Sequence, residues 1–215
     1  MLASACGASR PANRFINYGD GGKTIELMEA LPAPIRTLSG AERKAAVEKA
    51  RRERVAAPAV PTIETADGEL REALAAVRAQ PSTATHIRAG YAYARVGVLD
   101  YAVEHFDSAI ALDERSGAAY DARARVWRDW GLMGLALADA ARAIYFAPRA
   151  AAAHNTRGTI LTLLGRCDSA RAAYARALEL HPGAGYAKHN LEREGATGCR
   201  PPGPPKASTP QPPRR

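Results

Sequence analysis

Histidine and cysteine, which often carry catalysis or bind metal, are few in this chain, with five histidines and three cysteines. Its five histidines lie at positions 86, 105, 154, 181 and 189, and none has an evident nucleophile as a partner. No His/Cys pair has metal-site spacing, and the segment from Gly19 to Lys23 lacks the spacing of a phosphate-binding loop. We therefore expect no enzyme activity, no cofactor and no metal site, and we interpret His86 and His154 as packing residues.

The three cysteines predict covalent modification rather than catalysis. Small residues precede Cys6 in the opening run from Leu2 to Gly7, which resembles the lipobox of bacterial lipoproteins, where the cysteine is lipidated. Only five residues precede Cys6, whereas a signal peptide needs a basic start and an apolar stretch of about seven residues or more. Either the true start lies upstream or the match is accidental. Lipidation would anchor the protein to a membrane of the cell envelope, facing an extracytoplasmic compartment; the alternative is a cytoplasmic protein.

Cys167 and Cys199 form a candidate disulfide. Neighbouring helices lie about 8–10 Å apart, beyond the roughly 7 Å limit between bridged Cα atoms, but Cys199 follows Gly195 on a segment that could fold back. A bridge closing this loop of about 30 residues would stabilise the fold by about 3–4 kcal/mol. It would require an oxidising compartment, as would lipidation of Cys6.

A repeat of 34 residues organises the middle of the chain, with units at 83–116, 117–150 and 151–184. The repeated columns include Gly90, Ala124 and Gly158 (eighth), Gly97, Gly131 and Gly165 (fifteenth), Ala102, Ala136 and Ala170 (twentieth), and Ala109, Ala143 and Ala177 (twenty-seventh). A period of this length is typical of a stacked helical array, which presents a binding surface. Aromatics make up only 6% of the chain and Val, Ile and Thr do not alternate, so an all-α fold is predicted.

The segments around the repeats differ from them in composition. Residues 1–66 are predicted to be irregular apart from one basic helix near 39–55, opened by a capping box from Ser39 to Glu42. The array itself should span 67–194, with Asp67 capping a first helix and a short helix at 185–194 closing the stack before Gly195. Residues 195–215 carry seven prolines between 201 and 213 and are predicted to be a disordered tail.

These columns resemble the tetratricopeptide repeat (TPR), a helix–turn–helix unit of 34 residues. Matching positions are the large residue at column eleven (Tyr93, Trp127, Leu161), the ring at column twenty-four (Phe106, Tyr174, with Ala140 as an exception) and the proline at column thirty-two (Pro148, Pro182). Glycine at column fifteen should end each first helix in the left-handed conformation, and Asp100 and Asp168 could cap the second helices. Arg123 and Arg157 replace the usual leucine at column seven, and we expect them to snorkel.

The resemblance implies a concave groove lined by the first helix of each repeat. The candidate groove residues are Tyr91, Arg95, Asp121, Arg125, Arg128, Asn155, Thr159 and His189. Cations gathered around Arg95, Arg125 and Arg128 could hold a carboxylate of an extended peptide, with Tyr91 as an apolar anchor. An equally good interpretation is that Arg125 forms ordinary ion pairs with Asp121 and Asp129, four residues away on the same helix.

The partner is expected to be a protein or peptide. The positions that hold a Lys/Asn set in chaperone-binding TPR domains carry Ile87, Tyr91, Ala122, Ala152 and Thr156, so a chaperone C-terminus is not expected. The net charge of +8 and the cluster Arg51, Arg52 and Arg54 are a weak footprint for nucleic acid. The predicted function is a non-catalytic scaffold in envelope assembly or regulation. The alternative is a cytosolic adaptor whose basic N-terminal arm contacts anionic lipid or nucleic acid.

Overall fold

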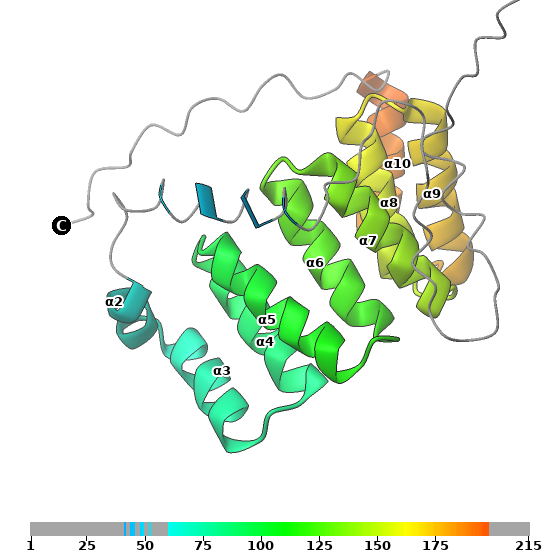
Figure 1. Cartoon of the computed structure of the whole chain (residues 1–215). Helices are drawn as coiled ribbons and strands as arrows, with labels where there is room; N and C mark the ends of the chain where they lie inside the picture. The colour runs from blue at the N-terminus through cyan, green and yellow to red at the C-terminus, as the bar shows by residue number, and fades with distance from the viewer. Residues whose placement is uncertain (1–40, 42–43, 46–47, 50–51, 53–59, 198–215) are drawn as a thin grey trace, which may run out of the picture.

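The computed structural model describes residues 60–197 and, before them, residues 41, 44–45, 48–49 and 52. Regular elements in 60–197 are all α-helices, which confirms the all-α prediction. In chain order they are α2 (Val60–Ala66), α3 (Gly68–Ala79), α4 (Thr83–Arg95), α5 (Leu99–Leu112), α6 (Gly117–Asp129), α7 (Met133–Phe146), α8 (Ala151–Leu163), α9 (Cys167–Leu180) and α10 (Gly185–Thr197) (Figure 1).

Each 34-residue unit forms one helical hairpin. The units begin with α4, α6 and α8 and end with α5, α7 and α9, and the two helices of each hairpin pack closely together. Gly97, Gly131 and Gly165 occupy the turns with φ of 81°, 80° and 70°, respectively. This is the left-handed conformation predicted for column fifteen, and glycine adopts it without the steric cost of a Cβ.

The small and large columns fit together inside each hairpin. A Cβ added to Gly90 would lie 2.5 Å from the Phe106 ring, and one added to Gly158 would lie 2.5 Å from the Tyr174 ring. Repeat two has Ala124 at the glycine column and Ala140 at the ring column, and both are fully buried. The exception at column twenty-four is therefore paired with a second change, because a methyl group fits at column eight only where the ring is missing.

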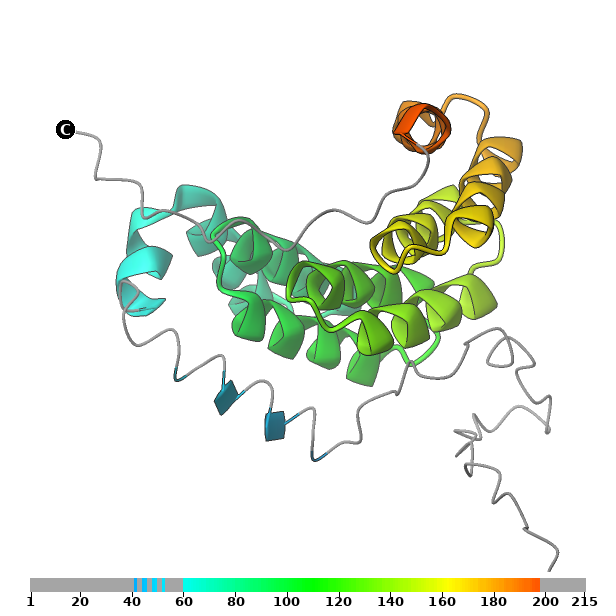
Figure 2. The ribbon, with the colours of Figure 1, turned by 90° about the horizontal axis from the view of Figure 1, so that it is seen from above.

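The stack bends so that the first helices line its inner side. Each of α4, α6, α8 and α10 contacts the next one in this series, whereas the second helices α5, α7 and α9 make no such contact with one another. Seen from above, the array of helices forms an arc with α4, α6 and α8 on its inner side (Figure 2). The side chains that these helices present on this side are called the inner face below.

The helix caps agree with the sequence only in part. Asp67 caps α3 by accepting a hydrogen bond of 2.8 Å from the Leu70 backbone N–H, as predicted. Asp100 and Asp168 are not caps: α5 and α9 start after Val98 and Arg166, which give no side-chain cap. The two aspartates lie in the first turn of their helices instead, where a negative charge is favoured by the helix dipole.

The ends of the array differ from the prediction in two places. Residues 60–66, predicted to be irregular, form α2, because Pro61 sits in the first helical turn, where its missing N–H costs nothing. At the other end, α10 continues through Gly195 to Thr197. Of the predicted helix near 39–55 only six residues are described, and these are helical; the tail beyond 197 lies outside the described residues. Within the described part of the chain, no helix is both long and apolar enough to cross a membrane.

Candidate functional site

Tyr91 and Arg125 are exposed neighbours on the inner face. Tyr91 on α4 is 40% exposed, and its ring packs edge-on against Phe106 at a centroid distance of 5.4 Å. The Arg125 guanidinium of α6 lies 5.7 Å from the centre of the Tyr91 ring, within cation–π range. Across the described residues Arg125 takes part in no ion pair, so the predicted pairs with Asp121 and Asp129 are not formed. An exposed guanidinium on an aromatic ring can receive a carboxylate without first breaking a salt bridge.

Arg128 lies one turn further along α6 and reaches toward α8. Its Nη1 donates to the Thr159 hydroxyl at 3.3 Å, and its Nη2 lies 2.7 Å from the Asp129 carboxylate. The Thr159 hydroxyl in turn donates to the Thr156 carbonyl at 2.8 Å. These contacts hold the guanidinium at the junction of repeats two and three, on the same helix as Arg125.

Asp121 is the buried member of the inner face. The residue is 8% exposed and its Oδ1 atom has no hydrogen-bond partner. Burial raises the pKa of Asp121, while the nearby Thr156 hydroxyl and the charges of Arg125 and Arg128 act in the opposite direction.

The side chains of the other predicted groove residues, Arg95, Asn155 and His189, form no hydrogen bond or ion pair with Tyr91 or Arg125. Arg95 does not join Arg125 and Arg128, because it pairs with Asp67 at 2.5 Å and Glu69 at 2.9 Å and so ties α4 to the start of α3. Asn155 accepts a hydrogen bond of 2.9 Å from Asn190 of α10. His189 is exposed on α10. The structure thus groups Tyr91, Asp121, Arg125, Arg128 and Thr159.

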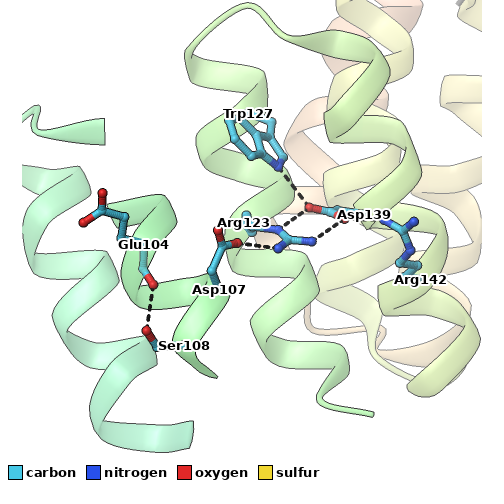
Figure 3. A network of polar contacts seen from close by, with 7 residues as sticks. All are labelled: Glu104, Asp107, Ser108, Arg123, Trp127, Asp139 and Arg142. Carbon is cyan, nitrogen blue, oxygen red and sulfur yellow. Dashed lines mark hydrogen bonds and ion pairs between the residues drawn. The ribbon is translucent and has the colours of Figure 1, made fainter. Parts of the chain in front are cut away.

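A buried charge network in repeat two corrects the prediction for Arg123. Its side chain is only 8% exposed and does not snorkel; Nε and Nη2 donate to the fully enclosed Asp139 carboxylate at 2.6 and 2.9 Å. Nη1 donates to Asp107 of α5 at 2.5 Å, which links repeats one and two (Figure 3). Trp127 and Arg142 also donate to Asp139, at 3.0 and 2.8 Å.

The pKa values in this network follow from those contacts. Burial alone would raise the pKa of Asp139, but the charges and hydrogen bonds of Arg123 and Arg142 outweigh it and hold that pKa below its usual value. Sequence reasoning missed the network. The available signal was an arginine at column seven in the repeat that also lacks the ring at column twenty-four.

The histidines of repeat one form an aromatic cluster. Nδ1 of His86 and Nδ1 of His105 are 3.1 Å apart, and the His105 ring stacks on Tyr93 with centroids 5.3 Å apart. The Tyr93 hydroxyl donates to Glu64, which connects the cluster to α2. Burial lowers the pKa of His105 to about 4, with the nearby His86 adding to the effect.

Cys167 is the one cysteine among the described residues. Cys167 opens α9, but Cys6 and Cys199 lie outside the described residues, so lipidation and the disulfide stay predictions. Among the described residues no group of three or more His, Cys, Asp or Glu side chains is arranged to hold a metal ion.

Comparison with known proteins identifies the fold. No protein-family model and no curated protein matches the sequence. The first TPR domain of Spaghetti (RPAP3), solved with the HSP90 peptide SRMEEVD, matches with a TM-score of 0.52 and 20% identity over 55% of this chain and 96% of that one. The first TPR domain of human RPAP3 gives 0.51 and 21% identity over 53% and 90%. MamA gives 0.51 and 22% identity over 75% and 86%. The chain therefore has a TPR-like helical-repeat fold.

Proposed function

We propose that this protein is a non-catalytic scaffold that holds an extended peptide or protein segment against its inner face. Arg125 and Arg128 receive a carboxylate of the ligand, and the Tyr91 ring contacts an apolar group next to it. Guanidinium groups suit this role because they donate two parallel hydrogen bonds to one carboxylate.

The observation that carries the proposal is the state of Arg125. Two exposed arginines of the outer helix α9, Arg171 and Arg176, are paired with carboxylates on their own helix. Arg125 instead rests on an exposed aromatic ring, in a fold whose neighbour in Spaghetti is bound to a peptide. The ligand chemistry differs from that of the chaperone-binding set, because Ile87, Ala122 and Ala152 replace polar groups along this face.

The test is a binding titration with a defined probe and a charge-matched control. The probe is a rhodamine-labelled peptide with one phenylalanine followed by two cysteic acids, compared with the same peptide carrying glutamines. The double variant Arg125→Ala/Arg128→Ala should weaken binding of the anionic probe at least about tenfold, since charge-assisted bonds contribute about 1.5–3 kcal/mol each. Arg171→Ala/Arg176→Ala removes the same net charge from α9 and should leave the affinity unchanged. Equal weakening by both variants, or none by either, would overturn the proposal.

We further propose an envelope placement, supported by the lipobox-like residues before Cys6. Cys6 is lipidated in this proposal, and a Cys167–Cys199 disulfide pins the end of the array in an oxidising compartment. Intact mass spectrometry of the natively expressed protein should show a lipid-modified Cys6 and no free thiol at 167 and 199. Unmodified Cys6 in a cytosolic fraction, with both thiols free, would exclude this placement.

The distribution of charge supports the alternative, a cytosolic adaptor with a basic arm. Residues 60–197 hold 16 basic and 16 acidic side chains, so the net charge of +8 belongs to the segments on either side, with 14 basic and 6 acidic residues. Cosedimentation with phosphatidylserine vesicles tests this alternative. Vesicle binding that weakens with added salt and in the variant Arg51→Ala/Arg52→Ala/Arg54→Ala favours the adaptor. Binding that changes neither with salt nor in this variant excludes it.

A further inference from the structure

Asp121 holds a carboxyl group where the fold gives it little compensation. Asp121 is 8% exposed at the contact of α6 with α8, and its Oδ1 atom is left without a hydrogen bond. A buried acceptor without a donor is costly when it is charged. The cost is smaller when the group carries a proton, so the environment of Asp121 favours its neutral form.

The groups that act on Asp121 come from three of the helices around it. Arg125 and Arg128 lie one and two turns further along α6, on the same side of the helix. Tyr91 approaches from α4 and the Thr156 hydroxyl from α8, while α5 and α7 contribute no charged group to it. Burial raises the pKa of Asp121; the nearby Thr156 hydroxyl and the two arginines limit that rise. The carboxyl therefore titrates beside the two cations proposed to bind a ligand.

We infer that Asp121 sets the charge of the inner face and thereby its preference for anionic ligands. When ionised, Asp121 offsets one of the two arginine charges and repels an incoming carboxylate. When protonated, it leaves Arg125 and Arg128 uncompensated. Acidification thus strengthens the capture of an anionic segment, and Asp121 acts through the arginines as a specificity-determining residue. This inference rests on the proposed function.

The size of the effect follows from Coulomb's law. Removing one like charge about 8 Å from a ligand anion, at an effective dielectric constant of about 40–80, changes the affinity by about two- to sixfold. The experiment measures the anisotropy of the cysteic-acid peptide probe over a pH series from about 7.5 down to about 4, the ordinary range of an Asp carboxyl, in which the cysteic acids stay ionised.

The wild-type protein should bind the anionic probe more tightly as the pH falls. Asp121→Asn keeps the shape of the side chain and removes the charge, so it should bind tightly at about pH 7.5 and lose most of the pH dependence. Asp168→Asn, an exposed carboxylate on α9, is the matched control and should titrate like wild type. Far-UV circular dichroism verifies that each variant is folded.

A second variant keeps the inference testable if Asp121→Asn fails to fold. Thr156→Val removes a hydroxyl that favours ionised Asp121, so it should move the midpoint of the pH profile upward. Two results would overturn the inference: an unchanged pH profile in Asp121→Asn, or weaker binding by that variant at every pH, which would make Asp121 a direct acceptor. If Arg125→Ala/Arg128→Ala does not weaken binding of the probe, the proposed function itself fails.

Discussion

Gly90→Ala adds one methyl group at a place where the core has no space for it. The new Cβ would lie 2.5 Å from Cε1 and 2.7 Å from Cζ of Phe106, whereas carbon atoms in contact sit about 3.5–4.0 Å apart. The ring must therefore retreat by about 1 Å. Phe106 is 0% exposed and Ala102 and Ala109 beside it on α5 are equally buried, so the ring has no free volume to enter.

Two effects of opposite sign decide the magnitude. Alanine is a better helix former than glycine by about 1 kcal/mol, which would stabilise Gly90→Ala if the position were open. Overpacking a close-packed core costs about 1–3 kcal/mol, and we expect the displacement of a buried ring by about 1 Å to cost an amount near the upper end of that range. We expect a net loss of about 2 kcal/mol in the free energy of unfolding.

A double-mutant cycle isolates the contact. Phe106→Ala alone leaves a cavity and should cost about 3–5 kcal/mol. The combination Gly90→Ala/Phe106→Ala reproduces the Ala124–Ala140 pair that repeat two already uses. Because the clash disappears with the ring, the double variant should be more stable than the sum of the single variants by about 2–3 kcal/mol.

The assay is urea denaturation followed by far-UV circular dichroism and by tryptophan fluorescence, since both tryptophans lie in repeat two. Ala124→Gly is the matched control: it relieves no clash, and it should lose about 1 kcal/mol from helix propensity and about 0.8 kcal/mol from the buried methyl group that it removes. A neutral or stabilising Gly90→Ala, or strict additivity in the cycle, would refute the idea that column eight and column twenty-four are sterically coupled.

Three further outcomes are expected. Arg123→Met removes the guanidinium that donates two hydrogen bonds to buried Asp139 and should lower the free energy of unfolding by about 3–5 kcal/mol. Arg123→Leu/Asp139→Leu should recover most of that loss in the same urea assay. An unchanged free energy of unfolding in Arg123→Met would contradict a stabilising network. His105 has a pKa lowered to about 4 by burial, so its neutral form stabilises the fold above about pH 6.5. That stability is lost as the pH falls toward 4, and thermal melts of His105→Gln should show a flatter profile than wild type over this range. Gly131→Ala forces a Cβ into a turn with φ of 80° and should cost about 1–2 kcal/mol; a melting temperature equal to wild type would contradict this.

Much of the fold could be predicted because its rules are local. Glycine at column fifteen is required by the backbone of the turn, and alanine at columns twenty and twenty-seven by the close approach of the helices. The 34-residue period repeats these local requirements, so they can be recognised without any long-range contact. The sequence does not predict α2, which begins at Val60 with Pro61 in its first turn, where proline is tolerated.

The site could be predicted only as a set of helix faces. Columns place Arg95, Arg125 and Arg128 on first helices, but the partner of each side chain depends on groups distant in the sequence. Arg95 pairs with Asp67 and Glu69, 28 and 26 residues earlier in the chain, because α3 packs beside α4. Arg125 turns to Tyr91 of the preceding repeat. No pattern within one helix distinguishes these two outcomes.

The sequence by itself determined the repeating helical hairpin, because helix formation, turn geometry and the small-residue contacts are all governed by neighbours within one unit. Only the tertiary structure decided which charges are available. Stacking one repeat on the next buried Arg123 with Asp139, enclosed Asp121 without a full set of partners and left Arg125 exposed on a ring. The reason is that desolvation and ion pairing depend on distances across the stack. Arg95, Arg123, Arg125 and Arg128 look alike in the sequence, but their surroundings give them different partners.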